Sequence, residues 1–164
     1  MENLIIRKAT VNDAEIICTI YNYYIENTII SFEERPVSVE DMQNRINKVT
    51  NVLPWLISED RGAITGYAYA DTWMSRSAYQ YTVKSAIYLD SRYKGQGIGT
   101  RLYQLLISEL RQLSMHSVMG IIALPNPASI ALHEKLGFEK VAHFKQVGRK
   151  FDKWIDVGYW ELLL

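Results

Sequence analysis

Apolar residues in the first part of the chain recur first at strand-like and then at helical spacing. Leu4–Lys8 predicts a short strand. From Ala14 to Ile25 apolar residues return every three or four positions, which is the period of a helix with one buried face. Asn12 and Asp13 precede this run and are suited to cap the helix.

A second helix is expected from Ser38, because Asp41 follows it at capping-box spacing. Later stretches are rich in β-branched and aromatic residues, and Asp60-Arg61-Gly62 between the first two is a hairpin-turn signal. These stretches predict strands at Trp55–Ser58, Ala63–Asp71, Tyr79–Leu89, Ser117–Leu124, roughly Phe138–Val147 and Trp154–Leu163.

Two more helices are expected among the later strands. Asn126 can cap the second of them, with Pro127 at its first position, and Gly137 can end it. The order of elements predicts one α/β domain over residues 1–164, with a mixed rather than wholly parallel sheet. The helix expected between the strands Tyr79–Leu89 and Ser117–Leu124 should bury a stripe formed by Leu102, Leu105, Leu106, Leu110 and Leu113.

Composition and charge narrow the classes of function. Apolar residues make up 48% of the chain and charged residues 22%, as in globular proteins. Basic and acidic residues number 18 each, so no net charge favours nucleic acid or a membrane surface. The three histidines lack zinc-ligand spacing, so no metal site is expected.

The compartment is inferred from three further features. No apolar stretch approaches membrane-spanning length, and the first residues lack the features of a signal peptide. The single cysteine, Cys18, cannot form an internal disulfide, and its helical spacing predicts a buried core thiol. We therefore expect a cytoplasmic protein.

A glycine-rich turn, Lys94-Gly95-Gln96-Gly97-Ile98-Gly99-Thr100, lies between the longest strand and the leucine-rich helix. Glycines let backbone N–H groups converge at a helix N-terminus, where the helix dipole favours an anion such as pyrophosphate. Lys94 and Arg101, with Arg92 nearby, add positive charge. The turn fits neither a Walker loop nor the dinucleotide fingerprint, whose third glycine is replaced by Thr100. A tight connection without a ligand is the alternative.

A second motif, Asn126-Pro127-Ala128-Ser129-Ile130-Ala131-Leu132-His133-Glu134-Lys135-Leu136-Gly137-Phe138, follows the next strand. Together the two motifs resemble the GNAT superfamily of acetyltransferases. There a [Gln/Arg]-x-x-Gly-x-[Gly/Ala] loop binds the coenzyme A pyrophosphate, and an Asn-led helix ending in Leu-Gly-Phe holds the pantetheine. Lys94 replaces the usual Gln or Arg. The resemblance implies the GNAT fold, with a mixed, mostly antiparallel central sheet flanked by helices.

Nearly the whole chain is similar to the phosphinothricin and methionine sulfone/sulfoximine N-acetyltransferases of this superfamily. The similarity implies a homodimer that uses acetyl-coenzyme A (acetyl-CoA) to acetylate amino-acid-like amines. The shared residues are Ile6-Arg7-Lys8-Ala9, Asp13-Ala14, Tyr21-Asn22, Phe32, Arg76, Tyr79, Thr82-Val83, Tyr88, the block from Asn126 to Phe138, Val147-Gly148, Phe151, Trp154 and Asp156.

The resemblance also assigns roles to residues that would bind the cofactor. The backbone of Ile87, Tyr88 and Leu89 would pair with the pantetheine arm like an added strand. Gly95 to Thr100 would hold the pyrophosphate, and Asn126 and Ser129 would contact the pantetheine end. His133 occupies the place of a tyrosine that protonates the departing thiolate in many relatives. Its imidazole could do the same, could hydrogen-bond the cofactor, or could be a packed helix residue.

In the acceptor pocket the resemblance makes Arg76 a clamp for a carboxylate or phosphinate, because its guanidinium meets two oxygens at once. Phe32, Tyr79 and Tyr88 would line the pocket. On an extended strand Lys84 and Tyr88 share one face, so Lys84 would also point into it.

Lys84 departs from the family at the catalytic base. The attacking amine must be neutral, and the base of the resembled family is the glutamate of Thr-Val-Glu, where this chain has Thr82-Val83-Lys84. Lys84 could bind an extra acidic group of a different substrate, or pair with a local carboxylate such as Glu33 or Glu34. It could be the base if burial lowered its pKa. Alternatively, Glu33 or Glu34 could act as base through water.

We expect an N-acetyltransferase that works by direct transfer in a ternary complex, because no activated nucleophile lies near the predicted thioester. The alternative is a non-catalytic or weakly active acyl-CoA-binding protein. This alternative arises because Lys84 replaces the expected catalytic glutamate. Acetylation of protein N-termini or lysines is a third option, and nothing in the sequence indicates the open peptide groove that it needs.

Overall fold

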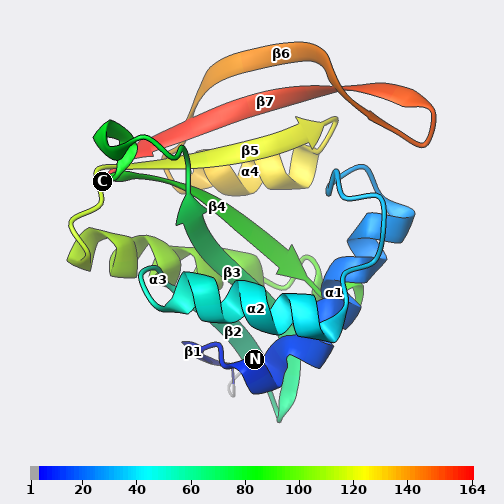
Figure 1. Cartoon of the computed structure of the whole chain (residues 1–164), viewed down its shortest axis with the longest axis vertical. Coiled ribbons are helices and arrows are strands. Elements are labelled where there is room, and N and C mark those ends of the chain that lie inside the picture. The colour runs from blue at the N-terminus through cyan, green and yellow to red at the C-terminus, as the bar shows by residue number, and fades with distance from the viewer. Residues whose placement is uncertain (1–3) are drawn as a thin grey trace.

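One sheet organises the chain, and the computed structural model describes residues 4–164 of it, so Met1–Asn3 of the expected domain lie outside the described residues. The 7-stranded sheet has the order β1-β2-β3-β4-β5-β7-β6 (Figure 1). Only the β4–β5 pair is parallel among its neighbouring strands, which confirms the expected mixed, mostly antiparallel sheet. The strands are β1 (Leu4–Lys8), β2 (Trp55–Asp60), β3 (Ala63–Thr72), β4 (Thr82–Leu89), β5 (Ser117–Leu124), β6 (Glu139–Lys150) and β7 (Lys153–Leu163).

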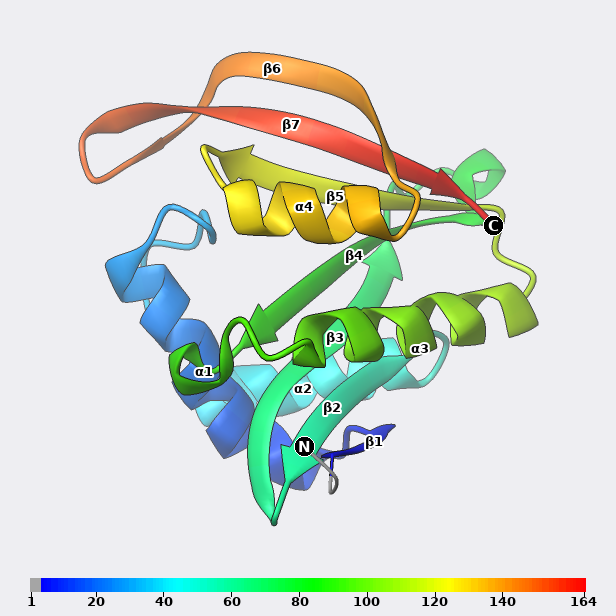
Figure 2. The same cartoon turned by 180° about the vertical axis from the view of Figure 1, so that it is seen from behind.

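Helices cover both faces of this sheet. Helices α1 (Ala14–Asn27) and α2 (Val39–Thr50) lie on one face, and α3 (Ile98–Gln112) and α4 (Pro127–Lys135) lie on the other (Figures 1 and 2). Three 3-10 turns connect the elements: η1 (Val11–Asp13), η2 (Ser77–Tyr79) and η3 (Ser91–Tyr93). None of the described helices is long and apolar enough to cross a membrane.

Two of the three predicted helix caps are confirmed. The Ser38 hydroxyl accepts a hydrogen bond from the N–H of Asp41, and the Asn126 side chain accepts one from the N–H of Ser129. The third is confirmed only in its position, because Asp13 is the N-cap residue of α1 but makes no side-chain capping bond to that helix. The Asp13 carboxylate accepts instead from the backbone N–H of Thr10 at 2.7 Å and from Arg7 at 2.8 Å, so it closes η1.

The structure also corrects a predicted strand boundary and a predicted buried stripe. Strand β4 begins at Thr82 and not at Tyr79, because the N–H of Tyr79 donates to the carbonyl of Arg76 and closes η2. In α3 the predicted stripe is partly wrong, since Leu105 and Leu113 are 37% and 46% exposed. Tyr103 and Ile107 are buried in their place. The full buried face of α3 consists of Ile98, Gly99, Leu102, Tyr103, Leu106, Ile107 and Leu110.

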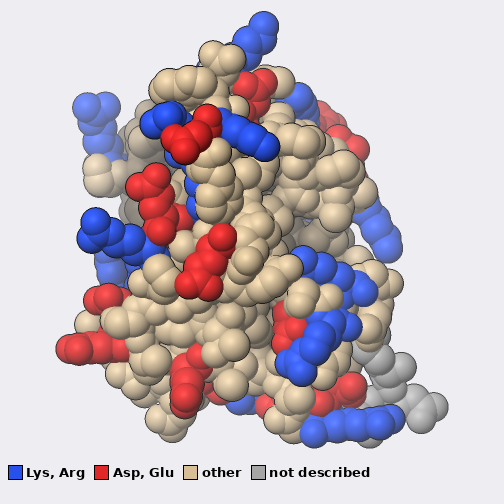
Figure 3. Space-filling model, turned by 90° about the vertical axis from the view of Figure 1, so that its right-hand side faces the viewer, with Lys and Arg blue, Asp and Glu red and all other residues tan. Residues whose placement is uncertain are grey.

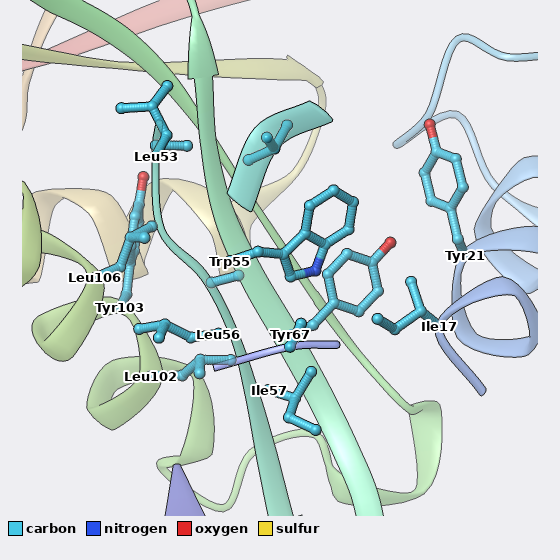
Figure 4. Close-up of a cluster of buried hydrophobic side chains, with 14 of the residues drawn as sticks. Ile17, Tyr21, Leu53, Trp55, Leu56, Ile57, Tyr67, Leu102, Tyr103 and Leu106 are labelled. Atoms are coloured by element: carbon cyan, nitrogen blue, oxygen red, sulfur yellow. The ribbon is translucent and has the colours of Figure 1, made fainter. Parts of the chain in front are cut away.

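The core joins the two helical layers through the sheet. Leu102 and Leu106 of α3 lie on one side of β2 and β3, and Ile17 and Tyr21 of α1 lie on the other (Figure 4). Trp55 stacks on Tyr69, with 4.2 Å between the ring centroids. Cys18 is buried in the core as predicted, and burial raises the pKa of its thiol. This packing holds β3, and with it β4, in place.

Charged side chains of both signs are interspersed over the face shown in Figure 3. Neither sign forms a continuous patch on that face, in keeping with the balanced composition of the chain.

Candidate active site

Strands β4 and β5 separate halfway along their length. They pair only from Thr82 with Ser117 to Ser85 with Gly120. Beyond that point β4 stays bonded to β3 and β5 to β7, and the two strands diverge (Figure 1). The backbone from Ala86 to Leu89 therefore has an open edge on the side of β5, which can pair with an extended ligand.

The separation leaves a cavity between the two strands, and this cavity shares wall residues with two larger ones. A cavity of about 60 Å³, here called the slot, lies between the two strands. The slot shares the wall residues Ile87, Asn126 and Ser129 with a second cavity of about 500 Å³. This second cavity lies at the first turns of α3 and α4 and is here called the helix-end cavity. Across Tyr88 and Ile121 the slot adjoins a cavity of about 480 Å³ beside the loop between α1 and α2, here called the loop cavity.

The helix-end cavity is built around the N-terminus of α3. Gly95 and Gly97 have φ of +75° and +79°, a backbone conformation that glycine adopts without strain. The N–H of Arg101 makes the first helical bond, to the carbonyl of Gly97, so the N–H groups of residues 98–100 precede the ladder and face outward from the helix end. Such an arrangement suits an anion.

Positive charge in the helix-end cavity comes from Lys94 and Lys135. The Lys94 ammonium lies 4.8 Å from the ring centroid of Tyr24, whose hydroxyl donates to the carbonyl of Leu89 at 2.6 Å. Burial raises the pKa of Tyr24 to about 12. Tyr24 therefore fixes the end of β4 as a neutral donor, and it places Lys94 at the cavity wall.

Most of the predicted cofactor-binding residues come together here. Lining the helix-end cavity are Ile87, Leu89, Lys94, Gly95, Gly97, Gly99, Thr100, Asn126 and Ser129, while Tyr88 and His133 line the slot. Gln96 donates to the carbonyl of Arg92, and Ile98 is fully buried, so neither side chain belongs to these walls. Of the cations expected beside the turn, Arg92 pairs with Asp90, and Lys94 is the one that lines the cavity.

His133 is a buried member of a hydrogen-bonded chain. Its Nδ1 lies 2.7 Å from the carbonyl oxygen of Ser129, which can only accept, so Nδ1 carries the ring proton. Nε2 then accepts from the Tyr103 hydroxyl at 3.0 Å, and Tyr103 in turn contacts the hydroxyl of Ser85. Burial lowers the pKa of the imidazole. The ring is therefore neutral near pH 7, with both nitrogens engaged.

The packing of His133 depends on Gly120 of β5. A Cβ at Gly120 would lie 2.4 Å from the imidazole ring, so only glycine leaves room for it. Sequence reasoning missed Gly120, Tyr103 and Ser85, because their contact with His133 joins residues far apart in the chain. It also missed Lys135, although this residue lies within the motif that carries the family resemblance.

The loop cavity contains Lys84 and Tyr88, which confirms that the two side chains share one face of β4. The Lys84 ammonium lies 3.4 Å from a carboxylate oxygen of Asp71, its neighbour in register on β3. Lys84 therefore pairs with a local carboxylate, as one predicted alternative had it, but the carboxylate is that of Asp71 and not of Glu33 or Glu34. Glu33 instead accepts from Arg45 at 2.6 Å and from Tyr21 at 2.8 Å.

The other predicted acceptor residues divide into two groups. Phe32 lines the loop cavity together with Tyr88. Arg76 and Tyr79 belong to η2 and its cap, where both are exposed and neither lines a described cavity. Tyr79 packs edge-on against Trp73, with 5.3 Å between the ring centroids. Within residues 4–164, no group of three or more His, Cys, Asp or Glu side chains could hold a metal ion.

Comparisons with known proteins agree with this geometry. The family model described as acetyltransferase (GNAT) domain matches residues 6–158. A phosphinothricin N-acetyltransferase of Streptomyces viridochromogenes is 35% identical over 95% of this chain and 85% of its own length. An L-methionine sulfoximine/L-methionine sulfone acetyltransferase of Salmonella typhimurium is 36% identical over 97% of this chain and 94% of its own.

Solved structures lead to the same family. A phosphinothricin acetyltransferase of Sinorhizobium meliloti in complex with acetyl-CoA superposes with a TM-score of 0.95, at 33% identity over 99% of this chain and 89% of its own. The chain belongs to the GNAT superfamily of acetyltransferases.

Proposed function

We propose that the chain transfers the acetyl group of acetyl-CoA to the amine of a small, amino-acid-like acceptor, directly and with both substrates bound. The observation that carries this proposal is the slot between β4 and β5, which adjoins a cavity at two helix N-termini and a cavity with charged and aromatic walls. The names of the relatives from Streptomyces and Salmonella support the acceptor class.

The helix-end cavity fits acetyl-CoA, the co-substrate that supplies an activated acetyl group. The N–H groups of residues 98–100 and the ammonium of Lys94 suit its pyrophosphate. The open backbone edge at Ile87–Leu89 suits the amides of its pantetheine arm. Asn126 and Ser129 line both the slot and the helix-end cavity, and they would guide that arm into the slot.

His133 contacts the slot, and its surroundings favour positioning over proton donation to the thiolate. Its only ring proton is directed to the carbonyl of Ser129, and Nε2 is an acceptor for Tyr103. A neutral imidazole in this state has no proton to give toward the slot. We therefore assign His133 to the wall that shapes the slot and holds the first turn of α4.

Lys84 fits the binding of an acidic group better than the role of a base. A lysine that acts as a base is usually buried or lies beside other cations. The side chain of Lys84 is 42% exposed and its ammonium lies beside the carboxylate of Asp71, so neither description fits it. Phe32 and Tyr88 would form the walls around the acceptor, while the contacts of Arg76 and Tyr79 give their expected roles no support.

Direct transfer is supported by the position of Cys18. Its thiol is buried in the core and donates to the carbonyl of Ser38, and burial raises its pKa. A thiol in this state is a poor nucleophile, because the thiolate is the reactive form. We assign the chain to the cytoplasm, where a free cysteine persists.

The alternative, an acyl-CoA-binding protein without turnover, rests on the missing strand glutamate. Steady-state release of the coenzyme A thiol, measured with a panel of amino acids and amines, separates the two. Release that depends on an amine supports the enzyme. Tight binding of acetyl-CoA with no release for any amine would establish the alternative.

We also propose a homodimer that uses the β6–β7 hairpin. On this hairpin Phe144, Val147 and Trp154 are 49%, 61% and 63% exposed, and β6 is an edge strand of the sheet. Exposed apolar side chains on an edge strand favour association with another chain. A two-fold interface is the commonest way to cover such a surface.

A further inference from the structure

The loop cavity has two charged side chains in its wall, and they come from different elements. Lys84 projects from β4, and Glu33 projects from the loop between α1 and α2. The remaining wall residues are apolar, aromatic or hydroxyl-bearing, as Phe32, Tyr88 and Ser31 illustrate. An acceptor in this cavity therefore meets one cation and one anion.

The Glu33 carboxylate is held in a fixed orientation. Arg45 donates to its two oxygens at 2.6 and 3.0 Å, and the Tyr21 hydroxyl donates at 2.8 Å. A carboxylate has about four acceptor sites, so three are used and roughly one remains for a ligand. The side chain is 37% exposed, so that remaining site is accessible.

The loop that carries Glu33 is fixed from the opposite side by the β6–β7 hairpin. Lys150, at the end of β6, is 3% exposed, and its ammonium donates to the carbonyl of Ser31 at 2.6 Å. The Ser31 hydroxyl bonds to Tyr21 and accepts from the N–H of Glu33. Figures 1 and 2 show the hairpin tip over this loop. Glu33 is thus positioned by α1, α2 and β6 together.

Other carboxylates near the cavity are less suited to meet an amine. Asp71 pairs with Lys84 and does not line the loop cavity. Glu34 is exposed and also lies outside the cavity wall. Glu33 is therefore the carboxylate that an acceptor bound in the loop cavity would reach.

We propose that Glu33 binds the amino group of the acceptor and accepts its proton, while Lys84 binds the acceptor's anionic group. The substrate class is then a zwitterionic amino acid or a close analogue, and Glu33 takes the place of the missing strand carboxylate. This inference rests on the proposed acetyl transfer, and it adds the residues that select and orient the acceptor.

The chemistry balances without any further reactant. The ammonium gives one proton to Glu33 through water, and the neutral nitrogen bonds to the carbonyl carbon of the thioester. The carbon–sulfur bond breaks, and the second proton lost by nitrogen passes through water to the departing thiolate. The products are an amide and a free thiol, and Glu33 releases its proton to solvent.

The pH dependence of this step should follow the acceptor and not Glu33. Partial burial alone would raise the pKa of Glu33, but the hydrogen bonds from Arg45 and Tyr21 outweigh it and hold the pKa below its ordinary value. Lys84, Asp71, Arg45 and Lys150 are the other charged groups around the cavity. The carboxylate is ionised throughout the neutral range, so kcat/KM should rise with pH toward the pKa of the acceptor's own ammonium group.

The central experiment compares Glu33→Gln with Glu34→Gln. Glu33→Gln should lower kcat/KM for amino acids by about 100-fold or more, the range of lost general-base catalysis. It should also weaken amino-acid binding in calorimetry while leaving acetyl-CoA affinity unchanged. Glu34→Gln should match the wild type in each measurement, and circular dichroism checks that both variants fold. Equal kinetics for Glu33→Gln and the wild type would overturn the proposal.

A second comparison needs no variant. The wild type should acetylate an amino acid at least about tenfold faster, in kcat/KM, than the corresponding carboxamide, which lacks the charge that Lys84 binds. A carboxamide acetylated equally well overturns the proposal while leaving the acetyltransferase intact. Absence of thiol release with every amine would instead contradict the proposed function itself, so the two failures are distinguishable.

Discussion

Replacement of Gly97 by alanine would isolate the backbone geometry of the helix-end cavity. Gly97 has φ of +79°, and a Cβ built on it meets no heavy atom within 4 Å. Alanine therefore introduces no clash, and its cost is backbone strain, about 1–2 kcal/mol for a residue other than glycine in the left-handed region. We expect this cost to divide between folding stability and acetyl-CoA binding.

The strain energy of the variant is fixed, however it divides between folding stability and acetyl-CoA binding. If the variant keeps the left-handed conformation, its free energy of unfolding falls by about 1–2 kcal/mol and its affinity is unchanged. If the free protein relaxes to another conformation, binding must restore the first, and affinity falls by up to about 5–30-fold. The loss of stability and the loss of binding free energy should then add up to the same strain.

Gly62 provides a matched control, because its φ is +81° and its Cβ also meets nothing within 4 Å. It lies in the turn between β2 and β3, outside the described cavities. Gly62→Ala should lose similar stability in urea unfolding and bind acetyl-CoA normally in calorimetry. The reasoning is refuted if Gly97→Ala loses neither stability nor affinity. It is also refuted if affinity falls by more than about 100-fold, which exceeds the strain.

Other expectations concern charge, pH and assembly. Lys84→Glu, measured by kcat/KM, should shift preference from acidic acceptors to neutral or cationic amines. If the native enzyme is fast at neutral pH and this variant is inactive with every acceptor, Lys84 is itself the base. Burial lowers the pKa of His133, so the stability that it contributes is present above about pH 6.5 and is lost as pH falls through its folded pKa. Thermal unfolding from pH 8 to 5 should therefore depend less on pH in His133→Gln than in the exposed control His116→Gln, and equal slopes would contradict this. Light scattering should give a dimer for the native chain and a smaller mass for Trp154→Glu, whereas a monomeric native chain would exclude the dimer.

The cofactor half of the site could be predicted from sequence because it is local. The turn at 94–100 and the helix that begins at Asn126 each carry their function within a few consecutive residues, so a motif is enough to place them. The face of β4 on which side chains lie could be predicted as well, since period-two alternation places Lys84 and Tyr88 on one face. What the motifs do not determine is which side chains from other elements complete the wall.

The acceptor half could not be predicted because its contacts join distant parts of the chain. The partner of Lys84 follows from the register of β3 against β4, which places Asp71 opposite it. Lys150 reaches Ser31 across 119 residues of sequence. Arg76 is the N-cap residue of η2, ahead of β4, and it does not line the loop cavity. Aromatic and charged residues near a motif therefore give weak evidence of a shared pocket.

The presence of Lys84 on β4, where the resembled family has a glutamate, affects more of the structure than its own position. A carboxylate on β4 would be supported by the sheet itself, which is rigid and packed on both faces. A carboxylate on the loop between α1 and α2 depends instead on Tyr21, Arg45 and Lys150, and therefore on how the β6–β7 hairpin sits over that loop. If Glu33 receives the amine, acceptor chemistry in this chain is coupled to the hairpin. The same hairpin carries the exposed apolar side chains of the proposed dimer, so assembly and acceptor binding would share one element.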